Sequence, residues 1–264
     1  MGKEQNCTII KIITLLTFLT MVIVNILANS LPINGVTAGQ VSDFYPNLFA
    51  PAGLTFAIWG LIYLLLAGYT LYQLGLFREG NESYSSGLLC RISVVFSVSS
   101  IANASWIFAW HYQIIPLSLL LIVVMLICLI KINEMTSKGS LTGRDYLFVR
   151  LPFSIYFGWI TVATIANVTI LLVSIGWTGF GLDETIWTVL VLAVGLIIAL
   201  ATMLKNRDVA YGLVIVWAYA GILLKHVSAD GWAFQYPVVI YTVLICIAIL
   251  VYAEAKLLSK KARL

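Results

Sequence analysis

Charge is scarce in this sequence, and that scarcity excludes the commonest classes of protein. Only 10% of the 264 residues are Asp, Glu, Lys or Arg, whereas a soluble domain carries about a quarter. Hydrophobic residues make up 61%, and the mean hydropathy is +1.02. This composition is typical of a polytopic membrane protein. The basic residues lie singly between apolar runs, so the net charge of +4 indicates no nucleic-acid partner.

Groups that bind metal or catalyse reactions are also scarce. The two histidines, His111 and His226, are expected near the outer membrane edge, either as interfacial residues or as axial ligands of a shared haem iron. No nucleophile–base pair, metal cluster or phosphate loop is recognisable. Four cysteines show neither metal-ligand spacing nor a disulfide framework: Cys7, Cys90, Cys128 and Cys246. The sequence therefore favours a binding protein over an enzyme and predicts no metal site.

Long hydrophobic runs, in contrast, are abundant. Windows of about 20 apolar residues predict eight membrane-spanning helices, and hence an all-α polytopic helix bundle. The predicted spans are 9–29, 52–77, 88–111, 114–131, 148–175, 185–204, 209–226 and 235–256. The first run is too long for a signal peptide and has no clear cleavage site, so we interpret it as an uncleaved helix.

The distribution of basic residues predicts the orientation. If both termini lie on one side, that side receives every Lys and Arg except Lys225. By the positive-inside rule, both termini are then cytoplasmic, and we expect a multi-pass protein of the cell membrane. None of the 11 acidic residues lies clearly in the middle of a span, which argues against ion or proton coupling.

The fifth predicted span carries a polar stripe that lipid would disfavour. At 3.6 residues per turn, five of its residues share one face within roughly 80° of arc. They are Pro152, Tyr156, Trp159, Ala163 and Asn167. A carboxamide in hydrocarbon needs partners, so this face should meet a cavity or other helices. Helix–helix contact is the simpler alternative, since Asn and small residues are ordinary in such contacts.

Aromatic and carboxamide residues of three spans fall at similar depths. A rise of about 1.5 Å per residue places them together in the outer half of the membrane. They are Trp59, Tyr63, Asn103, Trp106, Trp159 and Asn167. If their faces converge, they form an aromatic pocket with two carboxamides, which suits a flat, largely apolar ligand.

Position in the sequence predicts the environment of the remaining tryptophans and of the first outer loop. Four tryptophans near outer helix ends are expected at the headgroup level: Trp110, Trp177, Trp187 and Trp232. Trp217 lies deeper, where core packing is the simplest explanation. The 23-residue loop from Asn29 to Pro51 is long and aromatic, so it is either a lid over the pocket or a packed structural loop.

Three motifs occur in the order and on the helices where similar motifs occur in a known membrane family. The second span has Pro51 followed by W-x(3)-Y, and the third has N-x-x-W. The fifth has W-x(3)-A-x(3)-N. Their residues are Trp59 and Tyr63, Asn103 and Trp106, and Trp159, Ala163 and Asn167. Over residues 9–175, the sequence resembles the five-helix tryptophan-rich sensory protein / translocator protein (TspO/MBR) family.

The resemblance implies a pocket within the first five helices, covered by the first loop, that binds porphyrins, haem-related tetrapyrroles or benzodiazepine-type ligands. The implied ligand-binding residues are Trp59, Tyr63, Asn103, Trp106, Tyr156, Trp159, Ala163 and Asn167. The family's sterol-recognition pattern needs a Tyr and a basic residue, and the segment 168–179 has neither. The family's proline before the fifth-span tyrosine is replaced by Ile155.

The resemblance also suggests an organisation and a set of functions. Residues 1–175 would form the TspO/MBR-like bundle, and 176–264 would add three helices and a basic tail, which could supply a homodimer face, transport or signalling. We expect a sensor or carrier of a flat hydrophobic ligand, with the lipid bilayer and that ligand as its partners. The alternatives are a secondary transporter or permease for a small neutral molecule, and a porphyrin-degrading enzyme with Trp59 or Trp159 as redox residue.

Overall fold

The computed structural model describes residues 2–31, 33–78, 84–137 and 141–261, and those residues contain helices and no strand. Eight helices are long and apolar enough to cross a membrane, which confirms the predicted all-α polytopic bundle. Their membrane-spanning parts are Cys7–Ala28, Gly53–Leu74, Ser86–His111, Ile115–Thr136, Gly143–Ser174, Glu184–Asn206, Val209–Val227 and Pro237–Ser259. Lys138 and Arg263, which belong to the basic residues that predict the orientation, lie outside the described residues.

The chain folds into two compact units. The first unit comprises Met1–Ala38 and Ile58–Ile160, and the second comprises Gly39–Ala57 and Thr161–Leu264. These units differ from the two segments suggested by the sequence, a family-like bundle over 1–175 and three additional helices over 176–264. The division into those two segments stays a prediction. The helix α7 (Leu151–Ser174) contributes its first part to the first unit and its second part to the second unit.

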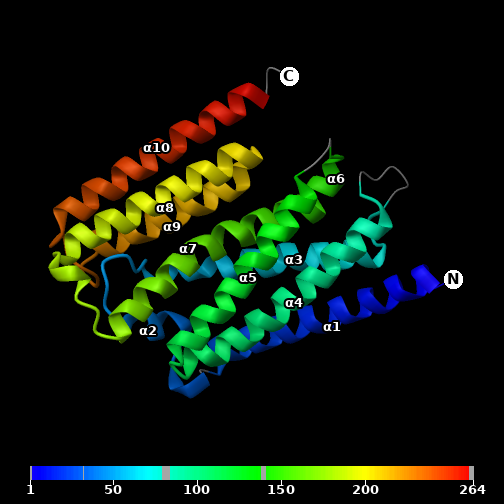
Figure 1. Ribbon diagram of the computed structural model, residues 1–264, viewed down its shortest axis with the longest axis horizontal. Coiled ribbons are helices and arrows are strands. Elements are labelled where there is room, and N and C mark those ends of the chain that lie inside the picture. The colour runs from blue at the N-terminus through cyan, green and yellow to red at the C-terminus, as the bar shows by residue number, and fades with distance from the viewer. Residues whose placement is uncertain (1, 32, 79–83, 138–140, 262–264) are drawn as a thin grey trace. The chain divides into compact units, whose positions relative to one another are not determined.

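The first unit is built around α4. This helix packs against α1 on one side and α5 on the other, while α3 contacts α1 (Figure 1). Small hydroxyl residues let α1 and α4 approach closely, since the Thr14 and Ser97 hydroxyls are 3.0 Å apart. The helices of this unit are α1 (Gly2–Ser30), α3 (Ile58–Leu74), α4 (Ser86–His111), α5 (Ile115–Thr136) and α6 (Gly143–Asp145), with the turns η1 (Ile33–Gly35) and η3 (Tyr146–Arg150).

The second unit is a set of long helices in which α10 packs against both α8 and α9 (Figure 1). Its close contacts use glycine: a Cβ at Gly195 would overlap the Tyr219 hydroxyl, which donates to the Leu192 carbonyl at 2.7 Å. The helices are α2 (Ala38–Asp43), α8 (Glu184–Asn206), α9 (Val209–Val227) and α10 (Pro237–Lys261), with the turns η2 (Gly53–Ala57) and η4 (Gly179–Gly181).

Polar residues extend the fifth span beyond the range that hydropathy predicts. The helical segment begins at Gly143 rather than 148, because the Thr142 hydroxyl accepts a hydrogen bond from the Asp145 amide at 3.1 Å. Arg150 is buried, and its guanidinium donates to the Asn133 carbonyl and the Thr136 hydroxyl at the end of α5. Charged residues lower the hydropathy of a segment, so the predicted span began too late. In the fold these residues are hydrogen-bonded and belong to the helix.

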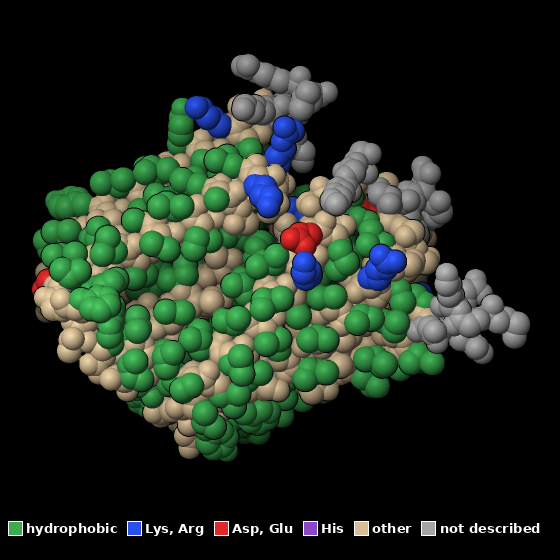
Figure 2. All heavy atoms as spheres, in the orientation of Figure 1, with side chains coloured by type: hydrophobic (Ala, Val, Ile, Leu, Met, Phe, Trp, Pro, Cys, Tyr) green, Lys and Arg blue, Asp and Glu red, His purple; other side chains and the backbone are tan. Residues whose placement is uncertain are grey.

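Hydrophobic side chains are spread over the visible face, with few charged side chains among them, as expected for contact with lipid (Figure 2). Many large aliphatic residues are exposed on the spanning helices, including Leu64, Ile101, Ile197 and Ile245. In water such an apolar surface would promote aggregation, whereas in a bilayer it is the surface expected to face the lipid. The protein is therefore an integral multi-span membrane protein.

Candidate functional site

An aromatic cluster lies inside the first unit. We define it as the side chains of Trp59, Tyr63, Trp106, Tyr156 and Trp159. Trp59 is its centre, with ring centroids 5.5 Å from Tyr63, 6.2 Å from Trp106, 6.0 Å from Tyr156 and 6.2 Å from Trp159. These separations are within the usual range of aromatic contact. The helices α3, α4 and α7 therefore direct their aromatic faces toward one another, as the similar depths predicted.

A chain of carboxamides and hydroxyls borders the aromatic cluster. The Asn103 amide donates to the Tyr156 hydroxyl at 3.0 Å, and Tyr156 donates to the Met125 sulfur at 3.3 Å. The Asn25 amide donates to the Asn103 side-chain oxygen at 2.8 Å and to the Met21 carbonyl at 2.9 Å. Sequence reasoning missed Asn25. The signal was an Asn within the apolar first span, where a carboxamide needs a partner.

Every side chain of the cluster and its polar border is electrically neutral, and the buried polar atoms there that lack a hydrogen-bond partner in the described residues include the Tyr63 hydroxyl and the Trp106 indole N–H. Trp106 is 3% exposed, and its indole Nε1 has no hydrogen-bond partner within the described part of the chain. A buried donor without an acceptor costs about 1–3 kcal/mol. The arrangement can therefore offer aromatic faces to a flat ring system and one N–H group to a hydrogen-bond acceptor.

Six of the eight predicted ligand-binding residues come together in this way. The other two lie farther along α7, in the second unit. Ala163 is partly exposed there, and Asn167 is buried, with its amide donating to the Ala163 carbonyl at 2.9 Å. This is a bond within one helix, so Asn167 satisfies part of its hydrogen-bonding capacity locally. Ligand binding by any of the eight residues stays a prediction.

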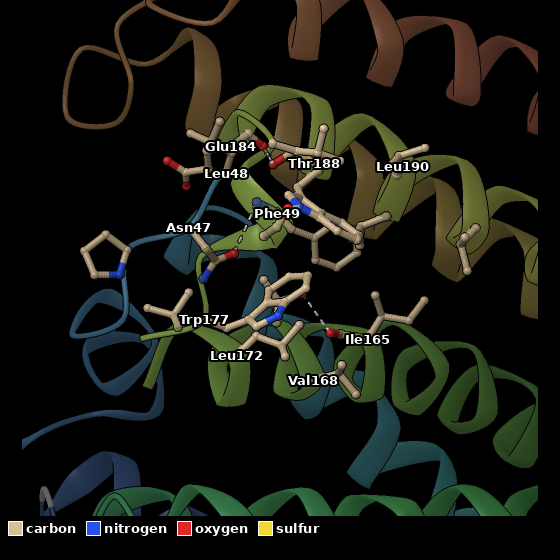
Figure 3. A pocket seen from close by; sticks show the side chains of 18 of the residues that line it. Asn47, Leu48, Phe49, Ile165, Val168, Leu172, Trp177, Glu184, Thr188 and Leu190 are labelled. Carbon is tan, nitrogen blue, oxygen red and sulfur yellow. Dashed lines mark hydrogen bonds between the residues drawn. The ribbon is translucent and has the colours of Figure 1, made fainter. Parts of the chain in front are cut away.

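The second unit contains a cavity that sequence reasoning did not find. Its volume is about 680 Å³, and it lies between the second part of α7, the first part of α8 and the segment from Pro46 to Phe49 (Figure 3). Leu48 and Phe49 are buried, and the Leu48 carbonyl accepts from His226 Nε2 at 2.9 Å. The first outer loop is therefore a packed structural loop in this region, and it forms one wall of the cavity.

Two tryptophans differ from their predicted environments. Trp110, expected at the headgroup level, is buried within the protein, where its indole N–H donates to the Ala38 carbonyl at 3.0 Å and its ring stacks on Trp106. Trp217 was expected in the core but is 42% exposed, and its indole N–H donates to the Thr55 carbonyl at 3.0 Å. In both cases a backbone carbonyl from the segment before α3, that of Ala38 or Thr55, accepts the indole N–H.

Both histidines are fully buried rather than interfacial. The imidazole Nδ1 of His111 lies 2.7 Å from the Ile107 carbonyl, and His226 bonds to Leu48 as described above. A carbonyl only accepts, so the contacting nitrogen carries the proton in each ring. Among the described residues, no three His, Cys, Asp or Glu side chains are grouped as metal ligands. Axial ligation of haem iron by these histidines stays a prediction.

Comparison with known proteins assigns the chain to a family. The sequence model of the family described as TSPO-like protein matches residues 11–255. Neither a curated protein sequence nor a solved structure matches the chain. The family match extends past the resemblance expected over 9–175 and includes α8, α9 and most of α10. Because it covers most of the sequence, the chain belongs to the TSPO-like protein family.

Proposed function

We propose that this membrane protein binds a flat hydrophobic molecule of the tetrapyrrole class at the aromatic cluster, as a sensor or carrier. The observation that carries the proposal is the buried Trp106 indole N–H, which lacks an acceptor among the described residues while lying beside the ring of Trp59. A ligand carbonyl or carboxylate would supply that acceptor. The aromatic faces would supply the contact area.

The cluster residues differ in how easily they could make room for a ring system. Trp106, Tyr156 and Trp159 are buried, and Tyr156 is also held by Asn103. Trp59 and Tyr63 are partly exposed and come from the same helix, α3. The ligand would therefore enter by displacing the Trp59 and Tyr63 rings from the three fixed ones.

A porphyrin titration in lipid nanodiscs tests the proposal. Protoporphyrin IX and hemin would be added to the wild type, and binding would be followed by the shift of the porphyrin Soret band, which does not depend on the number of tryptophans. Trp106→Phe keeps an aromatic ring and removes the N–H donor. We expect it to weaken binding by about tenfold or more, since a hydrogen bond to a charged group contributes about 1.5–3 kcal/mol.

Trp217→Phe is the matched control, because it makes the same change at an indole whose donor already has a carbonyl partner outside the cluster. Binding that is saturable, weakened by Trp106→Phe and retained in Trp217→Phe would support the site. Equal binding by all three proteins would place the porphyrin elsewhere or in the bilayer. No binding by the wild type would overturn the tetrapyrrole proposal and favour the permease alternative, whereas loss of bound porphyrin under light would favour the degrading enzyme.

A further inference from the structure

The cavity of the second unit is built separately from the aromatic cluster, because no cluster residue lines it. Its volume of about 680 Å³ lies within the 300–1,000 Å³ that is typical of small-molecule sites. All of its lining residues belong to the second unit, so its geometry is a property of that unit alone. It is therefore a candidate site in its own right.

The cavity is long in the direction of the helices. Along α8 its lining runs from Glu184 to Val194, which is about 15 Å of helix, and along α7 from Thr164 to Val173, about 14 Å. Since α7 ends and α8 begins at the same edge of the membrane, the cavity extends from that edge about halfway through a ~30 Å hydrocarbon core. An elongated molecule fits this space better than a compact one.

Polarity changes along the cavity. Asn47, Trp177 and Glu184 lie at the end nearest the loop, whereas Ile165 and Val168 lie toward the other end (Figure 3). The occupant should therefore be amphiphilic, with its polar group at the membrane edge and its apolar chain between α7 and α8. The opening is lateral as well, because the lining residues Val168, Leu190 and Val194 are exposed.

Charge determines which polar group fits. Glu184 is exposed and is the one ionisable side chain among the residues that line the cavity, and Asp183, the neighbouring helix cap, adds a second negative charge. No Lys, Arg or His is among the lining residues that the structure describes. An anionic headgroup would be repelled here, whereas an ammonium group would gain a charged partner.

We propose that this cavity binds a single-chain amphiphile with an ammonium headgroup, taken up from the bilayer. The alkyl chain lies between α7 and α8, and the headgroup pairs with Glu184 at the membrane edge. The tryptophans Trp177 and Trp187, whose ring centroids are 4.7 Å apart, flank the headgroup end. This site is independent of the tetrapyrrole proposal.

Photocrosslinking tests the site and the headgroup together. The protein in phosphatidylcholine nanodiscs would be labelled with a long-chain alkylamine that carries a diazirine in its chain, beside a fatty acid with the same chain and diazirine. Labelled peptides would be identified by mass spectrometry. We expect the amine to label the 164–176 and 184–194 segments about threefold to fivefold more than the acid does, as for an exposed ion pair. Glu184→Gln should remove most of that preference, leaving only the part due to Asp183.

Leu190→Trp fills the cavity, and Leu244→Trp is its matched control on α10. The two leucines are equally exposed, at 45%, but only Leu190 lines the cavity. Labelling that falls in Leu190→Trp and persists in Leu244→Trp supports the proposal, provided that both variants elute as the wild type does. Labelling that is equal in the two variants, or stronger for the acid than for the amine, overturns it. Porphyrin titration of Leu190→Trp should match the wild type, which keeps the two proposals separable.

Discussion

The first unit fills its interior with aromatic rings, whereas the second unit leaves space among aliphatic side chains. Both use the same helix, α7: its first part contributes Tyr156 and Trp159 to the aromatic cluster, and its second part contributes Thr164 and Val168 to the cavity. The rings of Tyr156 and Trp159 contact the ring of Trp59 on α3, whereas Thr164 and Val168 line open space. Side-chain volume along one helix therefore separates a closed core from an open one.

The side-chain hydrogen bonds beside the aromatic cluster differ from those of two threonines that line the cavity. In the first unit Asn25, Asn103 and Tyr156 link three helices. Around the cavity, the Thr169 and Thr188 hydroxyls bond to carbonyls four residues earlier in their own helices. Bonds within a helix do not hold it to its neighbours. These two hydroxyls therefore do not tie α7 to α8 across the cavity.

Truncating one tryptophan in each unit should give the largest difference. Trp159→Ala removes a buried ring and should lower the free energy of unfolding by about 3–5 kcal/mol. Trp177→Ala, at a partly exposed ring that already faces a cavity, should cost distinctly less. Thermal unfolding would be followed with a thiol-reactive dye at the buried Cys128 and Cys246, after Cys7→Ser and Cys90→Ser. Equal losses would contradict the contrast in packing.

Enlarging a valine in each unit reverses the experiment. Val149→Phe places a ring in the filled first unit and should lower the free energy of unfolding by about 1–3 kcal/mol, because overpacking forces the core apart. Val168→Phe places the same ring at the cavity, where we expect little change. The same dye assay measures both midpoints, and a loss at Val168 as large as at Val149 would show that the cavity closes in the bilayer.

Alkaline pH should produce a smaller effect in the first unit. Burial raises the pKa of Tyr84 from 10.0 to about 12, and its hydroxyl donates to the Thr136 carbonyl at 2.9 Å. A raised pKa in the folded protein means that this contribution is complete below about pH 10 and is lost as pH rises through 12. Tyr84→Phe should flatten the decline in midpoint above pH 10, whereas Tyr241→Phe, at an exposed ring, should not.

The spans were predictable because a bilayer imposes a length and a polarity on every crossing helix. The third span, for example, was placed at 88–111 and is found at Ser86–His111. The convergence of Trp59, Asn103 and Trp159 was also accessible, since helical rise gives depth and helical period gives the face. The depth and the face of a residue on a straight helix depend only on the sequence of that helix, so both can be predicted without knowing its neighbours.

Features made by distant segments were not predictable in this way. Trp110 is buried and donates its N–H to the Ala38 carbonyl, and no property of the third span indicates that contact. The cavity forms where the side chains of three segments, around Leu48, Leu172 and Leu190, leave the space between them unfilled. None of these segments has a motif. Asn25 is an intermediate case: its need for a partner was visible, but the identity of that partner was not.

Arg150 has two roles at two times in the life of the protein. During synthesis it is one of the basic residues that, in the orientation we expect, are retained on the cytoplasmic side and so direct insertion. In the folded protein its guanidinium is buried and bound to the carbonyl end of α5, where a cation complements the helix dipole. In that orientation, the same positive charge first directs membrane insertion and is then buried when the protein folds. If the chain has the expected orientation, the cytoplasmic surface of the folded protein presents one positive charge fewer to lipid headgroups than the sequence implies.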